Sequence, residues 1–286
     1  MITIKVPATS ANLSVGFDSL GIALTLYNVF TFEIASQNEL VGFEPEFMHE
    51  NLVLLGYQKV FDIYVKKNYQ PVKITLTKND IPISRGLGSS ASCIVAGVFA
   101  ANAMYDLNLT KEELAHLAVS LEGHADNVFA AIFGNLTAVF KEQESYFHDV
   151  FIPSKDFAFH VLIPQKQGST KKARSILPNV LNIEDSVYHL SRTIHIPKAV
   201  VTGNFDMLKR VLKDRIHELH RYPSIPLYHK IIALKENPDY IVCISGSGPS
   251  VLVITKVSST LEVDKEISKA FDVVSLLPTS GVEVIL

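Results

Sequence analysis

The chain has 286 residues, of which 48% are hydrophobic and 19% are charged, and its formal net charge is −3 at pH 7. This length suggests one large domain or two ordinary ones, and it is long enough to bury a core without covalent cross-links. Two cysteines are too few for a disulfide scaffold. The 26 basic residues do not outnumber the 29 acidic ones, so we expect no bulk attraction to a nucleic acid.

The sequence shows no targeting or membrane segment. Its first residues alternate between apolar and polar side chains, which predicts a strand and not a signal peptide. The longest apolar stretches, 94–104 and 128–133, are shorter than the ~20 residues that span a bilayer. We therefore expect a cytoplasmic protein that contacts no membrane, with both cysteines buried as small apolar groups.

The first half alternates strands with helices. Strands are predicted at 2–6, 22–34, 72–77 and 136–140, and helices at 51–67, 91–105, 110–122 and 126–134. A polar bend is expected at 9–12. Thr110 and Glu113 form a capping-box signature at the start of one helix. The charged segment 141–156 is expected to be irregular and to contain a domain boundary.

The second half has a different order of elements. We predict a strand at 157–163, helices at 170–176, 184–196, 205–221 and 226–235, strands at 240–244 and 251–255, a helix at 261–271 and a strand at 282–285. This is the split β-α-β order of ferredoxin-like domains. The sequence therefore predicts an α+β protein with two domains, residues 1–150 and 151–286.

A glycine-rich loop precedes the helix predicted at 91–105. It consists of Pro82, Ile83, Ser84, Arg85, Gly86, Leu87, Gly88, Ser89, Ser90, Ala91 and Ser92. Two glycines let the backbone approach a ligand closely, and the free N–H groups of a helix N-terminus favour phosphate. A dinucleotide site would need a second parallel strand after the helix, and a Walker loop would need a lysine. A tight turn with helix-capping serines is the alternative.

Two more segments carry polar groups that folding alone does not require. Residues 245–250, which include Gly246, Ser247 and Gly248, form a longer loop than a hairpin needs, although a flexible turn is an alternative. Residues 122–127 hold two carboxylates, an imidazole and an amide. Helix capping explains Asp126, but it leaves Glu122 and His124 unexplained. A carboxylate close to a phosphate loop is what Mg²⁺ requires.

Three motifs occur in the order that is typical of GHMP kinases: P-A-T-S-A-N-L-S-V-G-F-D at 7–18, the 82–92 loop and the 245–250 loop. Within that superfamily the chain resembles the homoserine kinases, through the first motif, H-A-D-N at 124–127, S-T-K-K-A-R at 169–174 and D-R-I-H at 214–217. The resemblance extends from about residue 4 to residue 250. Three features depart from the common pattern: Ser14-Val15 replaces Gly-Pro, Phe129-Ala130-Ala131 replaces Ala-Pro-Ala, and Glu122 stands only two residues before His124.

The resemblance implies an N-terminal domain like one of ribosomal protein S5 and a ferredoxin-like C-terminal domain. It also implies ATP-dependent phosphorylation of the L-homoserine hydroxyl to O-phospho-L-homoserine, on the route to threonine, and a homodimer is a further expectation at family level. The implied site residues are the 82–92 loop for ATP, Ser90 and Glu122 for Mg²⁺, Asn12, Asp18 and Asn127 for catalysis, His124, Thr170, Arg174 and Arg221 for homoserine, and Gly246, Ser247 and Gly248 for support.

Other readings remain open from the sequence. A GHMP kinase for another small alcohol is one, a non-catalytic protein that binds an amino acid or a nucleotide is a second, and a structural module is a third. The arginines could also lie on solvated helix faces. The mevalonate-type general base is an aspartate, and its place is occupied here by Asn127. We therefore hypothesise that no side chain acts as a strong base.

Overall fold

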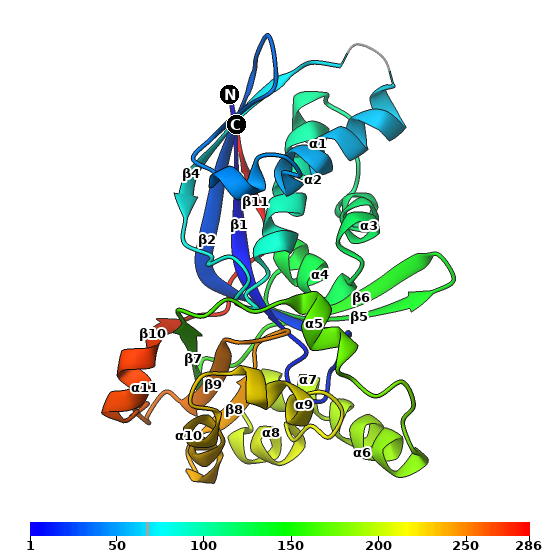
Figure 1. Cartoon of the computed structure of the whole chain (residues 1–286). Helices are drawn as coiled ribbons and strands as arrows, with labels where there is room; N and C mark the ends of the chain where they lie inside the picture. The colour runs from blue at the N-terminus through cyan, green and yellow to red at the C-terminus, as the bar shows by residue number, and fades with distance from the viewer. Residues whose placement is uncertain (67–68) are drawn as a thin grey trace.

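The computed structural model describes residues 1–66 and 69–286, and it contains two β-sheets with helices packed against them (Figure 1). The first sheet has seven strands in these residues: β1 (Ile2–Ala11), β2 (Leu20–Ile34), β3 (Glu39–Val41), β4 (Val72–Asn79), β5 (Leu136–Glu142), β6 (Ser145–Phe151) and β11 (Glu283–Ile285). Its main path is β11-β1-β2-β4-β3, and β5 pairs with both β2 and β6.

The second sheet has four strands in the described chain: β7 (Phe157–Pro164), β8 (Ile241–Ile244), β9 (Val251–Lys256) and β10 (Phe271–Leu276). Their spatial order is β10-β7-β9-β8, and every neighbouring pair is antiparallel. The predicted ferredoxin-like order is present, but its fourth strand is β10, which the sequence analysis missed. The strand expected at 282–285 exists as β11 and pairs with β1, so its assignment to the second sheet was wrong.

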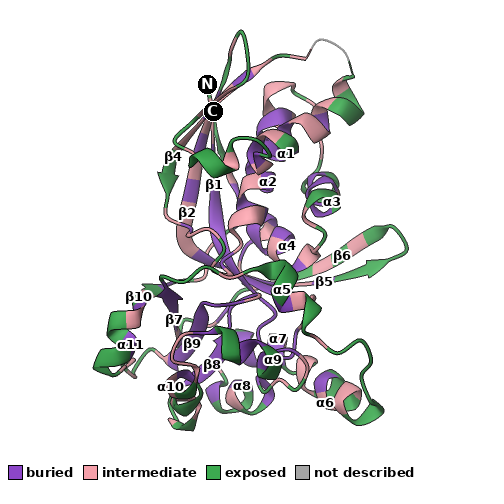
Figure 2. Cartoon of the chain, viewed as in Figure 1, coloured by how far each residue is buried: buried purple, intermediate pink, exposed green. Residues whose placement is uncertain are grey.

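One face of the first sheet is covered by helices. These are η1 (Pro45–Phe47), α1 (Leu52–Val60), a π-helical extension η2 (Phe61–Val65), α2 (Ser89–Met104), α3 (Lys111–Glu122) and α4 (Ala125–Phe133). The predicted helix at 51–67 is present to Val65, and residue 67 lies outside the described residues. Figure 2 shows α2 largely buried, which confirms the prediction from its apolar sequence. The capping box at Thr110 is also confirmed.

Two expectations for the first half are corrected. The bend expected at 9–12 is mostly strand, because β1 continues to Ala11 and pairs with β2 beyond a register shift at Pro7/Ala8. The segment expected to be irregular contains β6, which forms a hairpin with β5. Its polar side chains are exposed and bury little apolar surface, so composition alone suggested a loop.

Helices of the second half surround its sheet on the side away from α1–α4 and at the junction between the two sheets (Figure 1). They are α5 (Thr170–Ser175), α6 (Ile183–Thr193), α7 (Ile196–Val201), α8 (Phe205–Val211), α9 (Glu218–Arg221), η3 (Tyr222–Ser224), α10 (Tyr228–Ala233), η4 (Leu234–Glu236) and α11 (Lys265–Ala270). The continuous helix expected at 205–221 is broken. The Asp214 carboxylate accepts hydrogen bonds from the N–H groups of His217 and Glu218, at 2.8 and 2.7 Å, and so begins a new helix.

The apolar stripe predicted on the 184–196 helix exists in α6, but it faces outward. Ile183 is 83% exposed, Leu190 68% and Ile194 72%, whereas His189 on another face of the helix is buried. Elsewhere, one apolar cluster joins the two halves of the chain. It includes Ala8 and Ile22 of the first sheet together with Phe159 and Leu252 of the second.

The two sheets therefore share buried surface at the junction where the predicted motifs meet. The boundary expected near residue 150 stays a prediction. Within the part of the chain that the structure describes, none of the helices combines the length and the hydropathy needed to cross a bilayer.

Candidate active site

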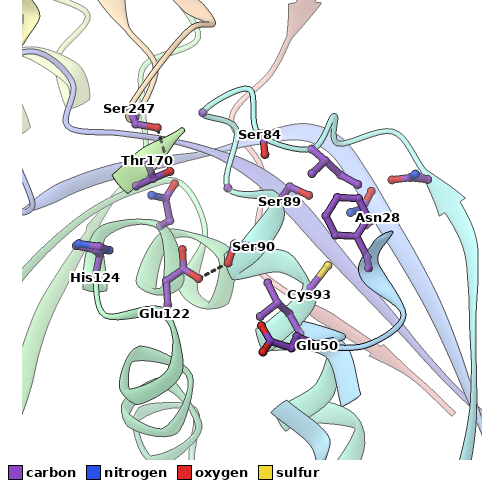
Figure 3. Close-up of a pocket in the computed structure, with 18 of the residues that line it drawn as sticks. Asn28, Glu50, Ser84, Ser89, Ser90, Cys93, Glu122, His124, Thr170 and Ser247 are labelled. Carbon is purple, nitrogen blue, oxygen red and sulfur yellow. Dashed lines mark hydrogen bonds between the residues drawn. The ribbon is translucent and has the colours of Figure 1, made fainter. Parts of the chain in front are cut away.

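A cavity of about 280 Å³ lies at the junction between the two halves. Its wall at one end contains the apolar residues Phe43, Phe47, Leu52 and Leu76. The opposite end contains charged side chains, which are Asp18, Glu122, Asp126, Arg174 and Arg221. The glycine-rich loop and the start of α2 lie between them, with Ser89 and Ser90 on the first turn of the helix (Figure 3). The cavity thus has an end with mostly apolar side chains, which also holds the Glu44 and Glu50 carboxylates, a middle suited to phosphate groups, and an opposite charged end.

The glycines of the first loop are required by its geometry. Gly86 and Gly88 have φ values of +76° and +70°, in the left-handed region that favours glycine. A Cβ on Gly88 would lie 2.0 Å from Thr9 Oγ1, and one on Gly86 would lie 2.3 Å from the carbonyl oxygen of Ser245. The Ser245 hydroxyl also donates to the Gly86 carbonyl at 2.7 Å. The two glycine loops are therefore packed backbone against backbone, and the N-terminus of α2 faces the cavity.

Several residues that were predicted to bind the cofactor are not among those that line the cavity. These are Pro82, Arg85, Leu87, Ala91 and Ser92, and the supporting residue Gly248 is also outside the lining. Leu87, Ala91 and Ser92 are buried in the protein. The Arg85 guanidinium donates to the carbonyls of Ile83 at 2.7 Å and Gln165 at 2.5 Å. Arg85 therefore fastens the loop to the segment after β7, and a direct contact of these residues with the nucleotide stays a prediction.

The remaining predicted site residues do line the cavity. They are Asn12, Asp18, Ile83, Ser84, Gly86, Gly88, Ser89, Ser90, Glu122, His124, Asn127, Thr170, Arg174, Arg221, Gly246 and Ser247. The Thr170 and Ser247 hydroxyls lie 3.3 Å apart, so α5 and the second glycine loop meet across its mouth (Figure 3).

Ser90 and Glu122 form a close pair of oxygen ligands. The Ser90 hydroxyl donates to Glu122 Oε2 at 2.5 Å (Figure 3). Burial raises the pKa of Glu122, and the hydrogen bond from Ser90 acts in the opposite direction. Glu122 is also the last residue of α3, where the helix dipole disfavours a negative charge. A cation held by both oxygens and by phosphate oxygens would relieve this unfavourable charge, so the pair fits Mg²⁺.

The first motif forms a tight loop with an unusual backbone. Asn12, Leu13 and Ser14 have successive φ values of +73°, +40° and +62°. The Asn12 side chain holds this loop in place, because its Nδ2 donates to the Gly246 carbonyl at 2.8 Å and its Oδ1 accepts from the Asp18 N–H at 3.0 Å. Asn12 thus ties the first motif to the third, and both halves of its amide have protein partners.

Two arginines meet one carboxylate at the charged end of the cavity. Arg174 donates to both oxygens of Asp18, at 3.0 and 2.7 Å. Arg221 is buried and donates to the Gly246 carbonyl at 3.0 Å. Their guanidinium carbons lie 5.5 and 5.3 Å from the centre of the Phe17 ring. Two guanidinium groups and the Asp18 carboxylate are therefore held side by side, and the Glu122 and Asp126 carboxylates line the same end of the cavity.

Asn127 is held in a fixed orientation by neighbours on both sides. Its Oδ1 accepts from the Thr9 hydroxyl at 2.7 Å, and its Nδ2 donates to Asp126 Oδ1 at 3.3 Å. Asp126 also accepts from the Asn127 N–H at 2.7 Å. Burial raises the pKa of Asp126 to about 7. Burial lowers the pKa of His124, and the nearby Arg174 guanidinium acts in the same direction.

Comparison with known proteins identifies the family of this chain. A model described as GHMP kinases N terminal domain matches residues 51–135. A homoserine kinase of Clostridium botulinum (strain Langeland / NCTC 10281 / Type F) is 36% identical over 273 residues, which cover 94% of this chain and 89% of that relative. The chain belongs to the homoserine kinase family. This identification confirms the resemblance seen in its motifs and makes the chain a phosphotransferase.

Solved structures of this superfamily confirm the fold. The structure of a homoserine kinase from Cytophaga hutchinsonii superposes with a TM-score of 0.83 at 23% identity and covers 99% of this chain and 97% of its own. The phosphomevalonate kinase of Streptococcus pneumoniae, solved with phosphomevalonate and AMPPNP, has a TM-score of 0.71 at 12% identity and covers 98% and 100%. The α+β fold implied by the resemblance is thus the fold of homoserine kinases and of more distant GHMP kinases.

Some residues that line the cavity were not predicted from the sequence. They are Asn28, Gly42, Phe43, Glu44, Phe47, Glu50, Leu76, Asn79, Cys93 and Asp126. Most lie on β2, β4 and the segment around η1, which carry no phosphate or metal motif. Asn51 and Leu52 also line the cavity, whereas the Asn102 side chain accepts a hydrogen bond from the Leu109 N–H. Cys93 is only half-buried, whereas Cys243 is buried as expected.

The pKa of Asp126 predicts a change of stability with pH. An ordinary aspartate has a pKa near 3.9, so between about pH 4 and pH 7 the folded state binds a proton that the unfolded state releases. This contribution to stability is complete below pH 4 and is lost as the pH rises through 7. Asp126→Asn should therefore gain stability relative to the parent chain by a few kcal/mol between pH 5 and pH 8, as measured by urea unfolding. The exposed Asp149→Asn is the control, and a parallel pH response of both variants would contradict the prediction.

Proposed function

We propose that this homoserine kinase family member transfers the γ-phosphoryl group of ATP to the side-chain hydroxyl of L-homoserine, giving O-phospho-L-homoserine on the route to threonine. The observation that carries the proposal is the order of groups along one cavity. An apolar end, a glycine loop at a helix N-terminus and a charged end with Asp18, Arg174 and Arg221 follow one another. The cytoplasmic location expected from the sequence stays a prediction.

The nucleotide fits the apolar end and the middle of the cavity. Phe43, Phe47 and Leu76 offer the apolar surface that a purine base requires, and Asn79 adds an amide for its polar edge. The phosphates would follow the backbone from Ser84 to the first turn of α2, where N–H groups and the helix dipole favour anions. This placement directs the γ-phosphoryl group toward the charged end.

L-Homoserine fits the charged end because it carries both an ammonium and a carboxylate. Arg174 and Arg221 supply guanidinium groups for the carboxylate, which arginine can bind through two parallel hydrogen bonds. Asp18 supplies an acceptor for the ammonium group. The Asp18–Arg174 ion pair already places the two partners 2.7 Å apart, so a zwitterion can join it with little separation of charge. His124, Thr170 and Asn127 complete the wall around this end.

The proposed transfer forms a bond between the homoserine hydroxyl oxygen and the γ-phosphorus, and it breaks the bond from that phosphorus to the β–γ bridging oxygen. ADP leaves, and the hydroxyl proton is released. Asn127 cannot take up a proton at neutral pH, and Asp18 is held by Arg174. We therefore retain the hypothesis that placement of the hydroxyl contributes most of the rate enhancement, as is usual in phosphoryl transfer. Mg²⁺ held by Ser90 and Glu122 would supply charge neutralisation of the phosphates.

A panel of alcohols tests the substrate. ADP release, measured by a coupled assay, should be fastest with L-homoserine. It should fall by about 10- to 100-fold in kcat/KM with 3-aminopropan-1-ol, which lacks the carboxylate, and with 4-hydroxybutanoate, which lacks the ammonium, because each leaves a charged partner unpaired. ADP release without an alcohol is the background control. Preference for mevalonate or another alcohol over homoserine would refute the proposal, and ligand binding without turnover would favour a non-catalytic role.

Glu122→Gln tests the cation site. The substitution keeps the size of the side chain but removes the charge next to Ser90, so the concentration of Mg²⁺ needed for half-maximal ADP release should rise at least about 10-fold. The exposed Glu142→Gln is the matched control and should leave the Mg²⁺ requirement unchanged. An unaltered Mg²⁺ titration in Glu122→Gln would show that the cation is held elsewhere.

The homodimer expected from the family also remains a proposal, and the outward stripe of α6 supports it. In an antiparallel pairing of two α6 helices related by a twofold axis, Ile183 would face Ile194 of the second copy and Val187 would face Leu190. This spacing makes the stripe self-complementary, as a twofold interface requires. All four side chains are more than half exposed in the single chain, from 57% for Val187 to 83% for Ile183.

Leu190→Glu tests this interface. The charge would fall in the middle of the paired stripes, so we expect a dimer of the parent chain to dissociate into monomers in light-scattering measurements after gel filtration. Val257→Glu alters another exposed apolar residue, which is 61% exposed and lies outside α6, and it should leave the dimer intact. A monomeric parent chain, or a Leu190→Glu variant that stays dimeric, would rule out the α6 interface.

A further inference from the structure

His217 is a buried histidine to which none of the sequence motifs assigns a role. It belongs to the D-R-I-H segment and lies immediately before α9, four residues before Arg221. Its side chain is 0% exposed. Its ring lies 5.2 Å from that of Phe17, which also contacts both arginines of the charged end. His217 is thus placed directly behind the proposed carboxylate site.

The hydrogen bonds of His217 define which ring nitrogen carries the proton. Its Nε2 lies 2.8 Å from the Ser14 carbonyl, which can only accept, so Nε2 must donate. Its Nδ1 lies 3.2 Å from Nη1 of Arg221, which can only donate, so Nδ1 must accept. The ring is therefore neutral, with its proton on Nε2. It joins the first-motif loop to the guanidinium of Arg221.

The surroundings of His217 favour this neutral form. Burial lowers its pKa, although the carboxylates of Asp214 and Glu218 act in the opposite direction. Glu218 is already paired with Lys235 at 2.9 Å. Asp214 accepts two backbone N–H groups, and its other oxygen is 3.6 Å from the ring nitrogens of both His217 and His189. A second proton on His217 would be on Nδ1, where it would face the positively charged Arg221 guanidinium and remove the acceptor.

Arg221 needs a partner of this kind to keep one orientation. Its other hydrogen bonds are to the carbonyls of Gly246 at 3.0 Å and Ala173 at 3.3 Å, and both are backbone groups on segments outside α9. His217 shares its helix turn and is itself tied to the Ser14 carbonyl. We propose that His217 is a positioning residue, which fixes the Arg221 guanidinium toward the substrate carboxylate by accepting a hydrogen bond at Nδ1. This inference rests on the proposed function.

Two amide substitutions at His217 each retain one of the two hydrogen bonds of the imidazole ring and remove the other. His217→Asn retains an oxygen near the position of Nδ1 and so can still accept from Arg221, but it loses the bond to Ser14. His217→Gln retains a donor near the position of Nε2 and so can still bond to Ser14, but it offers no acceptor at Nδ1. We expect His217→Gln to raise the KM for homoserine about tenfold or more, with little change in the KM for ATP, and His217→Asn to recover most of that loss.

The truncated substrates distinguish positioning from a general loss of structure. His217→Gln should lower kcat/KM for homoserine and for 4-hydroxybutanoate, which both carry a carboxylate, by about tenfold more than it lowers that for 3-aminopropan-1-ol. Equal losses on all three substrates, or equal effects of the Gln and Asn variants, would overturn the proposal. Arg221→Lys provides a second comparison, because a positioning role requires His217→Gln to add little to its homoserine KM.

A nuclear magnetic resonance measurement keeps this inference separate from the proposed function. Long-range proton–nitrogen spectra of the parent chain should show His217 protonated at Nε2 only, and the Nδ1 resonance should shift in Arg221→Lys. A ring protonated at Nδ1, or an Nδ1 resonance that does not respond to Arg221→Lys, would overturn the inference whatever the substrate is. If the parent chain fails to phosphorylate homoserine while these spectra are as expected, the proposed substrate is wrong and the contact is right.

Discussion

The carbonyl oxygen of Gly246 is the point on which the charged end of the cavity depends. It accepts one hydrogen bond from Asn12 of the first motif and another from Arg221 of α9. A carbonyl has two lone pairs, so both are used, and a donor that moved away would lose this hydrogen bond and leave one lone pair without a partner. The first motif and the proposed carboxylate site are therefore held at one fixed separation by a residue of the third motif.

The glycines around this carbonyl also keep the first and third motifs close together. Gly86 packs so closely on Ser245 that a single added carbon would meet backbone atoms, and Gly246 itself has φ +55°. Side chains at these positions would push apart the two halves of the chain at the junction. The net charge of −3 provides no strong overall field, so recognition of a small zwitterion would depend on local groups. Those at the charged end are two arginines and the carboxylates of Asp18, Glu122 and Asp126.

Much of the site could be predicted from sequence because its chemistry is local in the chain. The loop at Gly86 and Gly88, the serines that begin α2 and the capping box at Thr110 each need particular residue types over a few positions. Most strands and helices were also found, since hydrophobic spacing records which face is buried. The break before α9 was not predicted, because the apolar spacing continues across it while the Asp214 carboxylate accepts from the N–H groups of His217 and Glu218 at the start of α9.

What could not be predicted depends on contacts between distant segments. Phe43 and Phe47 form the apolar end of the cavity only because the segment around η1 folds beside α1 and β4, and they belong to no motif. Asp126 has the sequence signature of a helix cap, and only burial against its neighbours places it in the cavity with a raised pKa. The pairing of β11 with β1 could not be predicted either, because a strand of three residues with weak alternation does not indicate which sheet it joins.

The pairing of β11 with β1 has a consequence for the order in which the protein assembles. Thr3 pairs with Ile285, and Ile4 with Val284, so the edge of the first sheet is closed by residues at the opposite end of the sequence. During synthesis β1 would leave the ribosome long before its partner exists, and its outer edge would stay open while the whole second half is made. Contacts this distant in sequence are slow to form, and an open strand edge can pair with other chains. The completed first sheet is thus a late product of folding, and a nascent chain that stops before β11 should be prone to aggregation.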